Sequence, residues 1–474
     1  MSGGIRGRLG RGGEPAGCAG RFGGPGVTRD PSPLIPRDFP PEIFAARRGR
    51  LCDLLGTGAH ALLAGTGPEP GGELFRQTNE FYYLCGVEIP QAYLLLDAGA
   101  RRAALFVPPR PPDHAQFGDY LGAEDADRIR ALSGVDDVRD VRDLAGCLAG
   151  VRVLYLPHLP GERGRLYRED LARQERLAAS DPWDGGLSRE KRLIRLVRDR
   201  LPAVAIRDLN PAIDSLRAVK EPGEIDRLRE AGRLAALAVV EAMRATRPGI
   251  LESDLDAVAR YLFRKHGARG EGYPSIIAAG PRIWHPHYFR NDAPLADGDL
   301  VLFDAAPDYR YYTSDIGRMW PVGGTYSPIQ RELYGWVVAY HQVLLGLIRP
   351  GADAQTILRQ AAERMRPVTE SWPFAKPRYR EAARATLASP RPLSHPVGMA
   401  VHDNGGYAGA PLRPGTVFSV DPELFVPEER LYIRVEDTVA VTESGCEILT
   451  GAAPLELDAV EALMQEPTRF PYFD

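Results

Sequence analysis

Hydrophobic and polar residues alternate along two segments in the last quarter of the chain. At the start of residues 431–441, apolar side chains at every second position leave Arg434 and Glu436 on the opposite face. Residues 417–421 repeat the pattern and place Asp421 on their more polar face. A period of two is that of a β-strand, whose successive side chains point to opposite faces. The pattern therefore predicts two late strands, each of which carries an acidic side chain.

An earlier pair of strands also carries acids. Residues 300–304 are apolar up to Asp304, and a turn at residues 306–308 leads into a second strand over residues 311–320 that contains Asp315. Carboxylates on neighbouring strands of a hairpin can point at one spot from the same face. We therefore expect these two aspartates to lie together.

The order of the expected elements divides the chain into two halves. In residues 37–206, short apolar strands alternate with helical stretches, which is typical of an α/β domain. One aromatic stretch there, ending at Gly86, is expected to be a short strand. Residues 207–474 begin with helices, the first over residues 224–244 and the second capped by Ser253, and continue with strands. Helices followed by strands indicate an α+β domain.

Composition narrows the class of protein. Of 474 residues, 44% are hydrophobic and 26% charged, with a net charge of -4, so we expect a soluble globular protein without the positive field of a nucleic-acid binder. The chain contains no run of ~18 apolar residues, so we expect no membrane span. Residues 1–36 are rich in Gly, Arg and Pro without an apolar stretch, which predicts a disordered tail and no secretory signal. Five scattered cysteines without a C-x-x-C pair favour a cytoplasmic location.

The acids beside apolar strands suggest a metal site. A single carboxylate at a strand end is usually a solvated turn residue, and this alternative applies to each acid taken alone. Several carboxylates beside apolar strands need another explanation, because a charge next to an apolar strand is costly unless it is paired or bound to a metal. Four carboxylates in one cavity would repel each other, and two divalent cations would cancel that charge. Oxygen ligands with an imidazole suit Mn, Co or Zn.

Histidines gather in the same half of the chain. Five of the nine lie between His285 and His402, with His395 seven residues before His402 and with His287 ahead of the first acidic strand. A lone histidine is more often an ordinary surface or core residue. We interpret the following as such: His60, His114, His158, His266 and His341.

Five motifs occur in the order found in aminopeptidase P, prolidase and their relatives. The chain reads HYFRND, then DLVLFDAAPDYRYYTSDIGRMWPVGG, LSHPVGMAVHDNGG, LRPGTVFSVDPELF and LYIRVEDTVAVTESG. These segments resemble the two-aspartate, histidine and acidic-strand signatures of that family. LFRQTNEFYYLCG resembles part of its creatinase-type N-terminal domain. The resemblance covers roughly residue 39 to the C-terminus and implies a pita-bread catalytic domain.

The resemblance also implies roles for individual residues. The positions that match the five ligands of two divalent metal ions, of which Mn is expected and Co or Zn are alternatives, are Asp304, Asp315, His395, Asp421 and Glu436. His287 and His402 match two histidines that contact substrate, and Arg434 matches an arginine that holds a neighbouring carboxylate by charge-assisted hydrogen bonds.

Two positions depart from the family pattern. Asp421 stands where the family has Glu, which withdraws the carboxylate by about 1.5 Å, roughly one C–C bond. Glu423, two residues later, could replace it only if a bulge re-aimed the strand. Arg391 stands where a histidine usually precedes the Leu-Ser-His segment, which alters the pocket for proline.

These observations predict a metal-dependent Xaa-Pro aminopeptidase. Its partners would be peptides with proline in second position, with no nucleic acid or membrane, and the resemblance implies a homo-oligomer. An Xaa-Pro dipeptidase (prolidase) is the first alternative. A catalytically silent peptide-binding member of the fold is the second, although all five ligand positions keep side chains that can bind a metal. A metal-free hydrolase like creatinase would need those ligands replaced.

Overall fold

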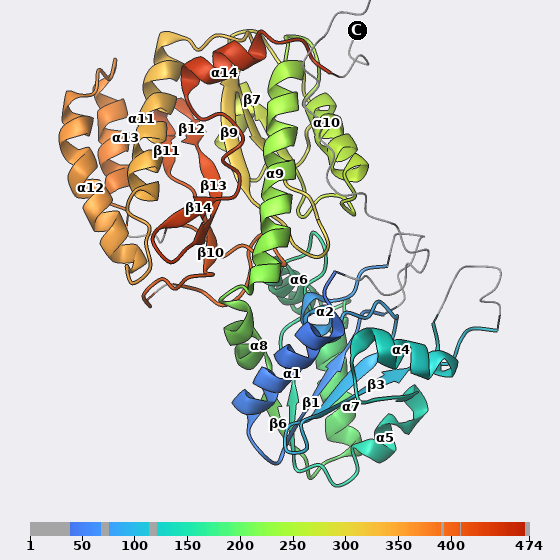
Figure 1. Ribbon diagram of the computed structural model, residues 1–474. Helices are drawn as coiled ribbons and strands as arrows, with labels where there is room; N and C mark the ends of the chain where they lie inside the picture. Colours follow the sequence, from blue (N-terminus) through green and yellow to red (C-terminus); the bar gives the residue numbers. More distant parts are fainter. Residues whose placement is uncertain (1–37, 68–74, 113–120, 390–392, 408, 470–474) are drawn as a thin grey trace, which may run out of the picture. The chain divides into compact units, whose positions relative to one another are not determined.

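A mixed six-stranded sheet organises the first half of the described chain (Figure 1). The computed structural model describes residues 38–67, 75–112, 121–389, 393–407 and 409–469, so the expectations for residues 1–36 and for Arg391 lie outside the described residues. The strands are β1 (Ala59–Ala64), β2 (Tyr93–Asp97), β3 (Arg102–Val107), β4 (Asp137–Asp140), β5 (Val153–Leu156) and β6 (Ala205–Asp208), in the order β4-β3-β2-β1-β5-β6.

Parallel and antiparallel pairs both occur in this sheet. Strand β2 pairs antiparallel with β1 and β3, whereas the three outer pairs are parallel. The helices that precede or connect these strands are α1 (Pro41–Leu55), α2 (Asn79–Cys85), α4 (Ala126–Ser133), α5 (Leu144–Cys147), α6 (Arg168–Ser180) and α7 (Arg189–Arg200), with single 3-10 turns η2 (Ala123–Asp125) and η3 (Val141–Asp143). The predicted α/β alternation is confirmed.

The aromatic stretch that ends at Gly86 is a helix, so the strand predicted there is wrong. Helix α2 starts after Thr78 and ends where Gly86 turns into the left-handed region at φ 63°, its N–H bonded to the carbonyl of Tyr82. Every side chain of α2 is buried. Burial on all sides leaves no periodicity to distinguish helix from strand, and tertiary packing overrides the β propensity of aromatic residues.

An antiparallel sheet organises the second half. Its strands are β7 (Ile276–Ala279), β8 (Leu300–Asp304), β9 (Ile316–Pro321), β10 (Val417–Val420), β13 (Glu436–Val441) and β14 (Cys446–Ile448), in the order β10-β13-β9-β8-β7 with β14 on β13. A separate hairpin contains β11 (Glu423–Val426) and β12 (Leu431–Arg434). The strand predicted over residues 431–441 is thus two strands, since β12 pairs with β11 and β13 pairs with β10 and β9.

Helices flank this second sheet on two sides (Figure 1). Helices α9 and α10 pack together on one side, while α11, α12 and α13 lie side by side on the other. No helix in the described ranges is both long and apolar enough to cross a bilayer. The helices of this half are α8 (Asn210–Arg217), α9 (Pro222–Ala245), α10 (Glu252–Lys265), α11 (Pro328–Leu345), α12 (Ala354–Ser371), α13 (Pro377–Leu387) and α14 (Leu457–Met464), with 3-10 turns η4 (Gly280–Trp284) and η5 (Pro427–Glu429).

The start of α10 differs from the prediction. Ser253 lies inside the helix, which begins one residue earlier. The first turn is closed instead by Asp254, whose carboxylate accepts a hydrogen bond of 2.8 Å from the Leu251 amide. An acidic side chain three residues into the helix satisfies one of the free amides there, so the capping role falls on the acid.

The β8–β9 loop carries two tyrosines into a core shared by both halves of the chain. Tyr311 stacks on Tyr82 with ring centroids 3.5 Å apart, and its hydroxyl accepts a bond of 3.0 Å from the Gln77 amide. Tyr312 donates a hydrogen bond of 3.0 Å to Glu224 on α9. Both rings are buried and belong to the hydrophobic cluster that contains β1, β2 and β3 side chains. The loop that joins the first two acidic strands is therefore anchored in the first half.

Candidate active site

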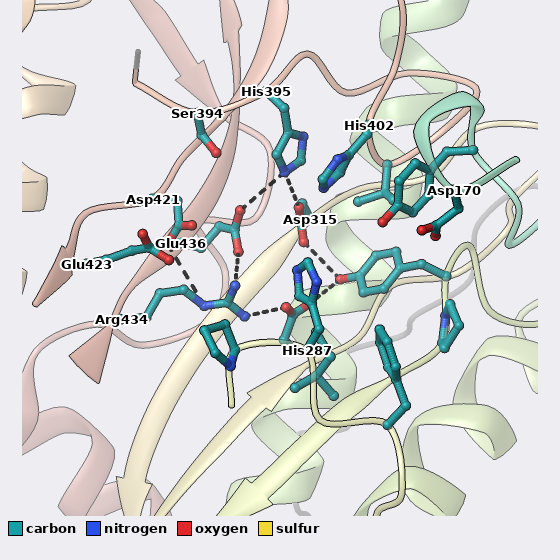
Figure 2. Close-up of a pocket in the computed structure, with 18 of the residues that line it drawn as sticks. Asp170, His287, Asp315, Ser394, His395, His402, Asp421, Glu423, Arg434 and Glu436 are labelled. Carbon is teal, nitrogen blue, oxygen red and sulfur yellow. Dashed lines mark hydrogen bonds and ion pairs between the residues drawn. The ribbon is translucent and has the colours of Figure 1, made fainter. Parts of the chain in front are cut away.

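One cavity of about 1530 Å³ contains all the site residues predicted from the sequence. Figure 2 shows most of them pointing toward a common space between the strands and two histidine-bearing loops. Both halves of the chain line it, because Tyr167 and Asp170 from the region of α6 also face the cavity. The predicted residues that line it are His287, Asp304, Asp315, His395, His402, Asp421, Arg434 and Glu436.

The sheet register brings three of the acids together. Gly317 on β9 is opposite Asp304 on β8 and opposite Glu436 on β13. Asp315 directly precedes β9, so its side chain projects from the same edge. A Cβ at position 317 would lie 3.1 Å from Arg434 Nε and 3.1 Å from Glu436 Cβ. A side chain here would crowd both residues, so glycine at this position favours the close approach of Arg434 and Glu436 to β9.

Tyr273 contacts both Asp304 and Asp315, so these two aspartates lie close together, as the predicted hairpin requires. Its hydroxyl lies 2.9 Å from Asp315 Oδ1 and also within hydrogen-bonding reach of Asp304. A phenol has a single proton and donates to one carboxylate at a time. Sequence reasoning missed this residue, because Tyr273 only marked the change from helices to strands and nothing local pointed to its partners.

The tightest cluster in the cavity consists of Asp315, His395 and Glu436. One ligand atom from each lies within 4.8 Å of the other two. His395 Nε2 is 3.2 Å from Asp315 and 3.9 Å from Glu436. Burial raises the pKa of both carboxyls well above their usual range, and the neighbouring carboxylates raise it further. The raised pKa values show that the negative charges are unfavourable here without a cation, so two buried acids and an imidazole are a suitable donor set for a divalent cation.

Arg434 lies among the other carboxylates. Its guanidinium is ion-paired with Asp304, lies 3.4 Å from Glu436 Oε2 and has its Nε 3.9 Å from Asp421 Oδ1. Within this group of side chains, three buried polar atoms have no hydrogen-bond partner among the described residues, namely Arg434 Nε, Asp421 Oδ1 and Glu436 Oε2. Unsatisfied buried carboxylate oxygens are rare in folded proteins unless an ion or water completes them. The residues present thus fit a metal centre.

Asp421 and Glu423 both line the cavity (Figure 2). The strand is interrupted between β10 and β11, and Pro422 lies in the interruption. Glu423 is close enough to Asp421 to raise its pKa, after the larger effects of burial and Glu436. The hydroxyl of Tyr432 donates a bond of 2.6 Å to Glu423 Oε1 and orients it.

The two predicted substrate histidines differ in their surroundings. His402 stacks between His395, with centroids 3.9 Å apart, and Tyr167, at 4.5 Å. Burial lowers the pKa of His402 to about 3, and the nearby His395 and His287 lower it further, so its imidazole is neutral near pH 7. His287 is exposed and has Phe289 beside it at 5.9 Å.

His341 lies outside the cavity, as expected of an ordinary core histidine. It is fully buried in α11, with Nε2 3.5 Å from Asp437. Burial is the main reason that its pKa falls to about 4. Its neutral ring is part of the packing between α11 and the second sheet.

Comparisons with known proteins agree with this geometry. The chain matches two family sequence models, "Aminopeptidase P, N-terminal domain" over residues 44–152 and "Metallopeptidase family M24" over residues 226–443. The Xaa-Pro aminopeptidase of Escherichia coli is 31% identical over 453 residues, which are 89% of this chain and 97% of that protein. Mouse Xaa-Pro aminopeptidase 3 is 30% identical over 410 residues, 82% of this chain and 76% of that protein.

Solved structures of a relative show the same fold. Zinc-substituted E. coli aminopeptidase P in complex with product has a TM-score of 0.73 at 29% identity, over 90% of this chain and 98% of that one. The same enzyme with the inhibitor Pro-Leu also has a TM-score of 0.73, at 28% identity. The two-domain prediction, an N-terminal aminopeptidase P domain followed by a pita-bread catalytic domain, is confirmed. This chain is a metallopeptidase of family M24 and belongs to the aminopeptidase P family.

Proposed function

We propose that this protein is a dinuclear metal-dependent Xaa-Pro aminopeptidase, which removes the first residue from peptides with proline in second position. The observation that carries the proposal is the convergence of all eight predicted site residues on one cavity. Residues far apart in the sequence rarely combine this donor set by accident. The residues that would hold two divalent cations are Asp304, Asp315, His395, Asp421 and Glu436.

Two divalent cations supply Lewis-acid chemistry, which polarises a scissile carbonyl and lowers the pKa of water. The chain's own groups do the rest. Asp421 lines the cavity, has an oxygen without a hydrogen bond and has a raised pKa, so it is suited to accept a proton and pass it to the leaving proline nitrogen. Arg434 fixes the carboxylate of Asp304 by its ion pair and keeps it from turning away.

The two histidines are suited to bind the substrate backbone. His402 is neutral, so one ring nitrogen donates and the other accepts a hydrogen bond. It can therefore hold a carbonyl oxygen on which negative charge develops without itself changing charge. His287 faces the same space from the loop before β8 (Figure 2). Both act on atoms that flank the bond to be broken.

The relatives favour an aminopeptidase over a dipeptidase. The Xaa-Pro aminopeptidase of E. coli is 31% identical to this chain, whereas human Xaa-Pro dipeptidase is 26% identical. The cavity of about 1530 Å³ has room for a peptide that continues beyond the proline. The E. coli relative has been solved in complex with product and with the inhibitor Pro-Leu, which supports peptide binding by this chain. A peptide-binding member without catalysis is the other alternative, and the complete set of ligand-capable side chains argues against it.

Metal identity, assembly and location are proposed from ligand chemistry, from the family resemblance and from the cysteines. Oxygen-rich ligands with one imidazole suit Mn, with Co or Zn as alternatives. The resemblance to the family supports a homo-oligomer. A cytoplasmic location is supported by the cysteines that the structure describes, all of which are free thiols: Cys52, Cys85, Cys147 and Cys446.

One experiment tests the proposed activity. Protein stripped with a chelator is titrated with Mn, Co or Zn and assayed on an Xaa-Pro-Xaa tripeptide, an Xaa-Pro dipeptide and an Xaa-Ala-Xaa control. We expect metal-dependent release of the first residue from the tripeptide and little from the control. Hydrolysis of the dipeptide alone would identify a prolidase. Metal binding without hydrolysis of any peptide would contradict an enzymatic role.

A further inference from the structure

The start of α6, in the first half of the chain, contacts the histidine proposed to bind substrate. Tyr167 immediately precedes α6 and stacks on His402, with centroids 4.5 Å apart and rings inclined by 29°. Glu169, two residues later, has Oε2 3.4 Å from His402 Nδ1. Residues 167 and 169 therefore approach the same imidazole, one over its face and one at its edge.

Arg168, between these two residues, is anchored elsewhere. Its guanidinium is 3.2 Å from Glu80 and 2.6 Å from Asp214, and its backbone amide donates a bond of 3.3 Å to Glu162 Oε1. These contacts fix the first turn of α6 to Glu80, Asp214 and Glu162. The position of Tyr167 over the imidazole thus depends on Arg168 and Glu162.

The second oxygen of Glu162 leads back to the same histidine. It lies 2.9 Å from Arg217 Nη2, and Arg217 is ion-paired with Asp403, the residue after His402. Lys220 holds the other oxygen of Asp403 at 2.9 Å. The side chains of Glu162, Arg217 and Asp403 are at most 1% exposed. Contacts therefore form a closed circuit that runs from His402 through Asp403, Arg217, Glu162 and the start of α6 to Tyr167, and back to His402.

We propose that Tyr167 is a positioning residue for His402, and that Glu162 ties it to the histidine loop through Arg217 and Asp403. The inference rests on the proposed function, because it assumes that His402 binds substrate. Tyr167 holds the imidazole from the face opposite His395, so that the ring stays aimed into the cavity when substrate enters. The N-terminal domain would then be part of the catalytic apparatus of its own chain.

The arrangement is better suited to positioning than to stability alone. Buried ion pairs are weak contributors to stability, because the cost of removing charges from water offsets their attraction. Tyr167 packs against the edge of the larger hydrophobic core, but it is only partly buried and also lines the cavity, so part of its surface is open to the site. Its hydroxyl interacts with Asp170 rather than with His402. The stacking face, and not the hydroxyl, is therefore the part that we expect to matter.

Paired substitutions separate the ring from the hydroxyl. Tyr167→Phe keeps the stacking ring, whereas Tyr167→Ala removes it, and Leu177→Ala, at an exposed site on α6, serves as the matched control. With an Xaa-Pro-Xaa tripeptide and saturating metal, we expect Tyr167→Ala to lower kcat by about threefold to tenfold, the worth of one aromatic contact. Metal content, KM and melting temperature should change little, and Tyr167→Phe should retain the wild-type kcat. Equal kcat for all variants would overturn the inference.

A second readout does not depend on turnover. Protein without metal, labelled with ¹³C at histidine Cε1, gives an NMR signal for His402 that is identified by its disappearance in His402→Gln. We expect this signal to move in Tyr167→Ala and in Glu162→Gln, and to keep its place in Tyr167→Phe. An unmoved signal in Tyr167→Ala refutes the positioning role. A moved signal in a protein that hydrolyses no Xaa-Pro peptide would instead refute the proposed function and leave the contact circuit standing.

Discussion

Lengthening Asp421 by one methylene is the most informative change in the site. Asp421 Oδ1 and Arg434 Nε face each other at 3.9 Å, and neither has a hydrogen-bond partner among the residues described. A charge-assisted N–H···O bond is about 2.8 Å long, so the pair is roughly 1 Å too far apart. One added C–C bond extends the carboxylate by about 1.5 Å, enough to close this gap.

The expected gain in kcat follows from the cost of a misplaced catalytic carboxylate. A catalytic group that lies ~1 Å from its working position can lose about 100-fold in rate. We therefore expect Asp421→Glu to raise kcat by about tenfold to 100-fold and to tighten binding of the second metal. Glu423 opposes this result, because it lies close enough to Asp421 to raise its pKa and would compete with a longer side chain for room.

Steady-state kinetics and calorimetric metal titration decide between these effects. Asp421→Glu is compared with Asp421→Ala, with Glu423→Gln and with the double variant Asp421→Glu plus Glu423→Gln. If Asp421→Glu loses both turnover and metal affinity while the double variant recovers them, Glu423 occupies the space and the site is adapted to the shorter acid. If Asp421→Glu and Asp421→Ala both behave like the wild type, the reasoning about this position is wrong.

Further predictions concern the ligands, the histidine and pH. Asp304→Asn and Glu436→Gln should each abolish metal-supported turnover while circular dichroism stays native, and retained activity in both would remove the metal-site interpretation. His402→Ala should lower kcat by on the order of 10²–10³ with little loss of metal, as expected for a lost hydrogen-bond donor, and an apo-level metal content would show that it is a ligand instead. Burial raises the folded-state pKa of Asp315 and Glu436, so in the apo protein their stabilising contribution is present at low pH and is lost as pH rises through those pKa values. The gain in melting temperature on adding metal should therefore grow as the pH rises, and a constant gain would contradict this account.

Strand patterns and motif order predicted most of the second half and its site. The alternation around Arg434 and Glu436 located an acidic strand pair, and the spacing of Asp304 and Asp315 predicted the hairpin that the register confirms. These features are local, because a strand's period of two fixes which side chains share a face. The break between β12 and β13 was not predictable in this way, since Val435 continues the alternation while the strand changes partners.

Contacts between distant segments could not be predicted from one sequence. Tyr273 and Tyr167 reach the site from loops whose neighbours carry no periodic signal, and their partners lie 31 or more residues away. The helix that ends at Gly86 was mistaken for a strand because burial on every side removes the polar face that distinguishes the two. In each case tertiary packing decided what local pattern left open.

The tyrosines at the tip of the β8–β9 loop couple the folding of the two domains. Tyr311 and Tyr312 are buried in a hydrophobic cluster whose other members come mostly from the first half of the chain. A fragment that lacked the first domain would expose both rings together with the base of the acidic hairpin. Heating should therefore unfold the chain in a single calorimetric transition rather than in two. The catalytic half expressed alone should aggregate, so fragments of this protein are poor substitutes for the whole chain in any screen.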